Sequence, residues 1–302
     1  SNTTGSNNNA IGQEALRKNT TGNYNQAIGR NALYANTTGC YNTAIGNNAL
    51  RSHTTGSTSV AVGADALYTD ISGSQNVAVG KNALKSNASA GLNTALGDTA
   101  LFSNTTGDKN TAAGGNAMYG NTTGKCNAAL GVESLKNNTT GCCNVAIGST
   151  AVYSNTEGSY NVGVGQRVLY SNTTGSVNTA VGFQALFSNT TADYNTAVGP
   201  YALYFNTTGC RNAAIGNNAL YSNISGACNA AVGNYALNKN TTGSYNTAIG
   251  NYSLACNTTG SWNSALGCGA LNNNTTGIGN VAVGTAPLLS NTTGGNNQAI
   301  GS

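Results

Sequence analysis

Residues 35–51 read ANTTGCYNTAIGNNALR, and the same pattern occupies the 17 residues on either side. Every seventeenth residue from Gly12 to Gly301 is glycine, which makes eighteen positions without an insertion. We number the repeat as columns 1 to 17, with Ser1 in column 1, and the consensus is x-N-T-T-G-x-x-N-x-A-[IVL]-G-x-x-A-L-x. The whole chain is a tandem repeat, so every copy must occupy an equivalent environment.

The length of the unit predicts the fold class. Seventeen residues are too few for the helix pair of an α-helical repeat. Two glycines per unit and the β-branched residues of column 11 also disfavour helix. The unit suits one coil of a solenoid whose short strands stack about 4.8 Å apart. The sequence therefore predicts an all-β fold, a parallel β-solenoid (β-roll or β-helix) with 17-residue coils and about 18 coils. Residues 1–302 would form a single domain, a segment of a longer array.

The columns predict which residues face the interior. The motif N-x-A-I-G, as at 42–46, is typical of a strand that ends in a glycine turn. The motif A-L-x predicts a second short strand, and NTTG is typical of a turn. Since successive strand residues face opposite sides, we expect Ile45 and Leu50 inside and Ala44 outside. Column 10 departs from alanine only at Gly163, which predicts that another surface lies against it: the opposite wall of a flat coil or another chain. Column 8 is asparagine in 17 of 18 copies and predicts an internal amide ladder.

Composition excludes several classes of function. Charged residues make up 7% of the chain, against about 25% in an ordinary soluble domain. A net charge of +4 over 302 residues forms no dense basic stripe, so we expect no nucleic acid partner. The sequence contains no run of 18 apolar residues, so we expect no membrane insertion. Paired carboxylates, catalytic triads, phosphate-binding loops and zinc spacings do not occur, so the sequence predicts no enzyme, metal site or cofactor.

The repeat resembles those of known surface proteins. Residues 241–254, TTGSYNTAIGNYSL, are similar to the TTGxxNTAxGxxAL arrays of bacterial surface proteins and of phage and viral tail-fibre proteins. The shorter motif N-x-A-[IV]-G-x-x-A resembles the head repeat of trimeric autotransporter adhesins. The resemblance implies a parallel β-roll, with three chains packed side by side on a bacterial surface. The adhesin head repeat is shorter and lacks NTTG, so a single-chain fibre stays open as an alternative.

The NTTG segment contains the N-glycosylation acceptor N-x-[ST], which column 2 retains in 15 of 18 copies. His53, Asp70 and Glu157 interrupt it. Because histidine and aspartate are tolerated, we expect column 2 to face solvent and to be accessible to a glycan. The alternative is a hydrogen-bonded turn, since the coils of His53 and Asp70 keep the hydroxyl. The candidate sites are Asn2, Asn19, Asn36, Asn87, Asn104, Asn121, Asn138, Asn172, Asn189, Asn206, Asn223, Asn240, Asn257, Asn274 and Asn291.

Stacked threonines are also typical of ice-binding solenoids, which need a flat T-x-T face on a strand. The two threonines of NTTG are adjacent, so we expect them to point to opposite sides. Ile71 and Ile224 replace the first threonine, which indicates that it faces inward. An ice-binding solenoid therefore stays only as an alternative function.

Column 17 is rich in aromatic and cationic residues. Exposed Tyr and Arg are typical of interfaces, so this column is a candidate for fibre packing or carbohydrate contact. The alternative is a stripe of long side chains that covers the coils. The candidate interface residues are Tyr34, Tyr68, Tyr119, Tyr153, Tyr170, Tyr204 and Tyr221.

Two of the eight cysteines, Cys126 and Cys143, share column 7 one coil apart. At a rise of about 4.8 Å this spacing predicts a disulfide. Thiols acting as small apolar fillers are the alternative for all eight cysteines.

These observations predict a structural extracellular fibre or filament protein with a repetitive, glycosylated surface. The alternative is a trimeric adhesin head or a phage or viral tail-fibre shaft that binds host surfaces. We expect self-association, either end to end or as a lateral trimer, and covalent glycans. The expected location is extracellular, on a cell surface or on a virion.

Overall fold

The computed structural model describes residues 2–301, and in this range the chain is all-β with one three-residue strand per coil. The first nine strands are β1 (Asn9–Ile11), β2 (Gln26–Ile28), β3 (Thr43–Ile45), β4 (Val60–Val62), β5 (Val77–Val79), β6 (Thr94–Leu96), β7 (Thr111–Ala113), β8 (Ala128–Leu130) and β9 (Val145–Ile147). The other nine are β10 (Val162–Val164), β11 (Thr179–Val181), β12 (Thr196–Val198), β13 (Ala213–Ile215), β14 (Ala230–Val232), β15 (Thr247–Ile249), β16 (Ser264–Leu266), β17 (Val281–Val283) and β18 (Gln298–Ile300). The described residues include no helix that could cross a membrane.

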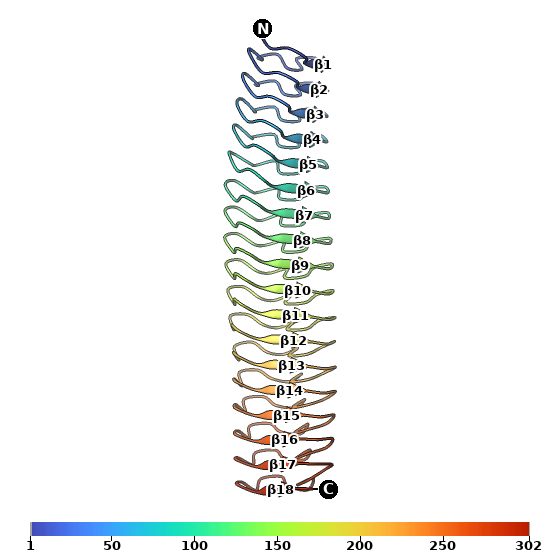
Figure 1. Ribbon diagram of the computed structural model, residues 1–302, viewed down its shortest axis with the longest axis vertical. Coiled ribbons are helices and arrows are strands. Elements are labelled where there is room, and N and C mark those ends of the chain that lie inside the picture. Colours follow the sequence, from blue (N-terminus) through green and yellow to red (C-terminus); the bar gives the residue numbers. More distant parts are fainter. Residues whose placement is uncertain (1, 302) are drawn as a thin grey trace. The chain divides into compact units, whose positions relative to one another are not determined.

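The chain divides into two compact units. Unit 1 comprises Ser1–Thr150 and Ser154–Glu157, and unit 2 comprises Ala151–Tyr153 and Gly158–Ser302. Unit 1 carries β1–β9 and unit 2 carries β10–β18, and in each unit the strands follow one another in chain order (Figure 1). All pairings within a unit are parallel, so the predicted parallel β-solenoid with 17-residue coils is confirmed.

Each column pairs with itself. Ala44 of β3 lies opposite Ala27 of β2 and Ala61 of β4, and the register is the same in the other pairs. Backbone hydrogen bonds between coils continue where no strand is present: the N–H of Leu50 donates to the carbonyl oxygen of Ala66 at 3.0 Å. Neighbouring coils therefore satisfy one another's backbone around most of the circumference.

The predicted second strand at A-L-x is wrong, because these residues form a turn. Asn48 and Leu50 have φ of 57° and 49°, in the left-handed region. This conformation costs a non-glycine residue about 1–2 kcal/mol. It is held by inter-coil bonds, since the N–H of Asn48 also donates to a neighbouring coil, at Arg30 O (2.9 Å).

At the strand, the residues that face the interior are the opposite of those predicted. Leu50 is fully buried as expected, but Ala44 is also fully buried and Ile45 is 39% exposed. Column 10 is small because the coil's own interior leaves no space for more. At Gly163 an added Cβ would lie only 2.7 Å from Cγ2 of Val152. A larger residue would therefore collide with the column-16 side chains that fill the core.

The predicted internal ladder of column 8 is confirmed, with backbone groups as its main partners. Asn42 is fully buried, and its Oδ1 accepts from the N–H of Ser59 in the next coil at 3.0 Å. Its Nδ2 donates to Gly56 O at 3.0 Å. Each amide therefore fixes the turn of the neighbouring coil.

Column 12 requires glycine for two independent reasons. Gly46 has φ of 136°, which side chains rarely adopt, and an added Cβ would lie 2.7 Å from the carbonyl carbon of Gly63. The same two constraints recur from Gly12 to Gly284, and Gly301 shares the positive φ, which explains why the column is glycine.

Candidate functional site

The asparagines of NTTG form a buried ladder. Of the candidate glycosylation sites, all except Asn2 and Asn291 are fully buried. Nδ2 of Asn36, for example, donates to Asn19 Oδ1 at 2.8 Å and to Gly39 O at 3.1 Å. The expectation that column 2 faces solvent is therefore wrong. A glycan on Nδ2 would displace these bonds, so we expect the buried acceptors to carry no sugar in the folded chain.

His53 and Asp70 replace asparagine in consecutive coils because they bind each other. Both side chains are fully buried, and His53 Nδ1 lies 2.7 Å from Asp70 Oδ2. His53 Nε2 lies 2.8 Å from Gly56 O, which only accepts, so Nε2 carries a hydrogen. Asp70 Oδ1 accepts from Asn87 Nδ2 at 2.7 Å and continues the ladder. Their spacing of 17 residues was the sequence signal for this pairing.

The threonines of NTTG have different environments. The hydroxyl of the first one donates to the next coil, as Thr37 Oγ1 does to Thr54 O at 3.0 Å. The second one, such as Thr38, is exposed. Ile71 and Ile224, which replace the first threonine, are 52% and 47% exposed. The predicted inward orientation of the first threonine is therefore wrong, because its column lies at the surface of the turn.

The aromatic residues of column 17 contact one another. In unit 1 the guanidinium of Arg51 lies between two rings, 5.7 Å from the Tyr34 centroid and 5.5 Å from that of Tyr68. In unit 2 the rings of Tyr170 and Phe187 stack at 5.2 Å and 7°. The ring faces are used within the column, which supports the alternative of a covering stripe. Fibre packing or carbohydrate contact at this column stays a prediction.

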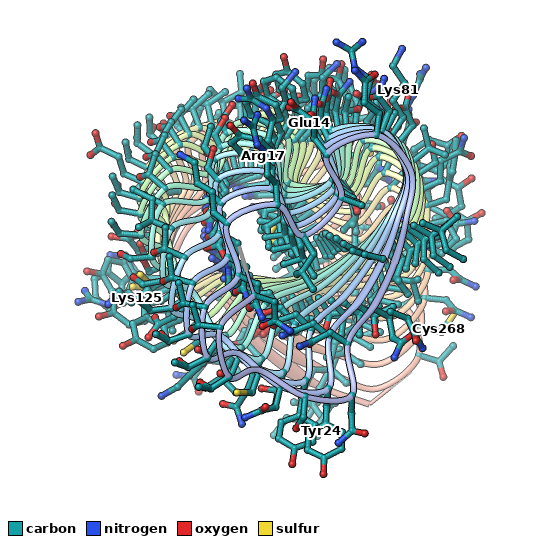
Figure 2. The ribbon with its side chains drawn as sticks, turned by 90° about the horizontal axis from the view of Figure 1, so that it is seen from above. Glu14, Arg17, Tyr24, Lys81, Lys125 and Cys268 are labelled. Atoms are coloured by element: carbon teal, nitrogen blue, oxygen red, sulfur yellow. The ribbon has the colours of Figure 1, made fainter. Side chains whose placement is uncertain are left out.

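Column 7 carries aromatic residues that are more exposed, and the sequence reasoning did not single them out. Tyr24 and Tyr41 stack at 4.9 Å in unit 1, and Tyr245 and Trp262 stack at 4.2 Å in unit 2. These four side chains are 48–59% exposed, and Figure 2 shows Tyr24 pointing away from the coil. Their shared spacing of 17 was visible, but only the fold shows that the column faces solvent.

A third column forms an apolar face in each unit. We call the column-11 residues of β1–β18 the aliphatic strip; all are Ile, Val or Leu except Ala113. Its exposed members include Ile28, Ile45, Leu96, Leu130 and Ile147 in unit 1 and Val181, Val198, Ile215, Ile249 and Leu266 in unit 2. The twelve cations and eight acids of the chain all lie outside columns 8–12. Sequence reasoning placed this column inside, and so missed the surface.

Cys126 and Cys143 lie in adjacent coils of unit 1, as the predicted disulfide requires. Cys126 is exposed and Cys143 half-buried. Their backbones have equivalent positions, since the N–H of Cys126 donates to Asp108 O and that of Cys143 donates to Lys125 O. The disulfide itself stays a prediction.

Charged side chains form local pairs at the surface. Glu14 Oε1 accepts from Arg17 at 2.6 Å, and Glu133 Oε1 accepts from Lys136 at the same distance. Figure 2 shows other cations, such as Lys81, pointing outward. In residues 2–301 no three His, Cys, Asp or Glu side chains gather as a metal site would require.

One surface hollow of about 250 Å³ lies in unit 2. Tyr235 and Tyr252 line one side, and Ala255 lies where earlier coils carry a column-17 tyrosine. The hollow therefore marks the end of the aromatic stripe, where small side chains no longer fill the space.

Neither protein-family models nor curated proteins match this sequence.

Proposed function

We propose that this chain is a structural module of a fibre or filament on a cell or virion surface. The observation that carries the proposal is that the buried polar groups bond one coil to another. The side-chain amides of columns 2 and 8 bond the next or previous coil, as in Asn36 to Asn19 and Ser59 to Asn42. Such a sequence specifies a regular, repetitive surface rather than one localised site.

Electron microscopy of the purified full chain tests this function. We expect ordered assemblies whose long axis follows the coil stack. Immunogold labelling of the source cells or particles should place the chain on their outer surface. Dispersed single particles at every concentration, together with labelling confined to the cell interior, would reject the proposal.

Host-surface binding, as by an adhesin head or tail-fibre shaft, is the second candidate. The exposed column-7 aromatics support it, because Tyr and Trp are enriched in binding interfaces. Binding of the purified chain to a glycan array tests this function, with Trp262→Ser as the variant. The control is Phe183→Ser, because Phe183 is an exposed aromatic residue outside columns 7 and 17. The binding function requires a signal that W262S loses and F183S keeps.

A further inference from the structure

The aliphatic strip is a continuous apolar surface in each unit. Ile45 of β3 is 39% exposed and Ile249 of β15 is 40% exposed. The column neighbours above and below cover the rest of each side chain. Column 9 flanks the strip with Thr, Val, Ala or Ser in every coil except those of Asn9, Gln26 and Gln298. A second surface can therefore approach the sheet closely at the other coils.

Charge is excluded from this face. All twenty charged residues lie in columns 1, 2, 4, 6, 7, 13, 14 and 17, on the turns around the strand. Lys or Glu on a surface strand would protect the sheet against association with other proteins through its edge or its face. The chain places such residues on both sides of the strip and none on it, which is the composition of an interface core with a polar rim.

We propose that the aliphatic strip is the contact surface between two copies of this chain, packed sheet to sheet. The inference rests on the proposed structural function and names the partner and the face. The spacing of the strip supports a second copy as the occupant. Aliphatic side chains recur once per coil, about every 4.8 Å, so ridges and gaps match along the whole contact only if the partner has the same period.

The number of strips argues for a pair of copies. Each coil has one strand, and each strand presents one outward face. Packing one flat sheet against one other covers this face completely, as in a two-sheet sandwich. A closed trimer would require two separate contact faces on every copy.

The area is consistent with a dimer of the full chain. Nine strands at about 4.8 Å and a face roughly 10 Å wide give roughly 400 Å² per unit. A stable interface needs roughly 800 Å² from each partner. One strip alone does not reach this value, so a stable dimer requires that the strip of each unit packs against a second copy.

The first experiment measures the molar mass of the full chain by light scattering and sedimentation. We expect twice the 30.2 kDa chain mass for the wild type at concentrations below those at which ordered assemblies form. Ile45→Lys with Ile249→Lys should shift the population to the monomer. The matched control is Ile71→Lys with Ile224→Lys, because these isoleucines are 52% and 47% exposed but lie off the strip. The control should remain dimeric.

The second experiment separates loss of the interface from loss of the fold. The variant Ile45→Glu with Ile249→Glu should also be monomeric. An equimolar mixture of the Lys and Glu variants should recover the dimer, because opposite charges then face each other across the strip. Recovery at low salt that is lost at high salt would show that both variants fold and use this face.

Several outcomes would overturn the inference. A wild-type monomer, a trimer, or a dimer that survives the Lys variant would each do so. If the wild type is a monomer with thermal hysteresis and the Lys variant loses this hysteresis, the strip binds ice and not a second copy. End-to-end filaments one chain wide would overturn the dimer but support the structural function. A dimer that labels inside cells would support the inference and reject the surface fibre.

Discussion

Each of the two units contains a paired exception to the buried consensus, in which two substitutions lie in contact, and the two pairs differ in how fully they restore the consensus contacts. In unit 2, Gly163 replaces alanine in column 10, and Val168 replaces alanine in column 15 of the same coil. In unit 1, His53 and Asp70 replace two asparagines of column 2. In the apolar pair, Gly163 lacks the methyl group of alanine, and Val168 adds methyl groups on the other wall of the coil. The polar exchange keeps most hydrogen bonds but leaves Asn36 Oδ1 without a partner.

The difference follows from the physics of the two interactions. Volume has no direction, so a methyl lost at one position can be replaced from a neighbouring one. A hydrogen bond needs a donor facing an acceptor, and His53 turns its Nδ1 to Asp70 rather than to Asn36. Restoring the consensus should therefore affect the two sites differently.

The largest effect is expected for His53→Asn alone. The introduced amide would bond Asn36 and Gly56 as the ladder does. Its oxygen, however, would face the carboxylate of Asp70, and two acceptors would meet in a buried site. Removing one partner of a buried pair costs about 3–5 kcal/mol. Urea denaturation should show an unfolding free energy lower by about 3 kcal/mol, at the low end of that range.

Asp70→Asn is the control for this prediction. The amide introduced by this substitution would donate to Nδ1 of a neutral His53, so we expect a clearly smaller loss than for H53N. Equal losses for the two variants would contradict the assigned directions of the hydrogen bonds.

Gly163→Ala should have the second largest effect. The added methyl would lie 2.7 Å from Val152 Cγ2 and 3.0 Å from Val168 Cγ1. Overpacking of this kind costs about 1–3 kcal/mol, measurable as a lower urea midpoint. The double variant with Val168→Ala should regain part of the loss, because it removes the contact with Val168 Cγ1 but not the one with Val152 Cγ2. Additive losses from G163A and V168A would show that the two positions do not compensate each other.

The double variant His53→Asn with Asp70→Asn should be more stable than the wild type by about 1 kcal/mol. The first introduced amide would donate to Asn36 Oδ1, which now lacks a donor, and the buried pair would be replaced by neutral amides. A higher thermal midpoint is the expected measurement. A double variant less stable than D70N would contradict the role of Asn36.

The sequence predicts the period of the repeat, but it does not predict the environment of every residue in the coil. Eighteen glycines at a spacing of 17 predict the solenoid, because only identical coils have one backbone constraint repeated without exception. A three-residue strand has two possible phases, however, and N-x-A-I-G suits both. The phase is decided by the width left beside Leu50, which depends on the turn of the folded coil. Column 2 was misjudged because His53 and Asp70 each look polar and tolerated until the fold places them in contact.

The smallest effect is expected for a substitution in column 17, at the surface. It tests whether a change in a surface column needs a compensating partner. Arg51→Gln would remove a guanidinium that lies over two rings and donates to Tyr68 Oη at 3.0 Å. A cation–π contact at an exposed site contributes about 0.5–1 kcal/mol, so we expect a loss of that size in the unfolding free energy. Arg30→Gln, an exposed arginine outside this column, is the control and should change stability less. A loss as large as that of H53N would mean that column 17 is as constrained as the buried ladder. A loss near the expected value would place the stronger constraint inside the coil, where His53 and Gly163 each have a compensating partner.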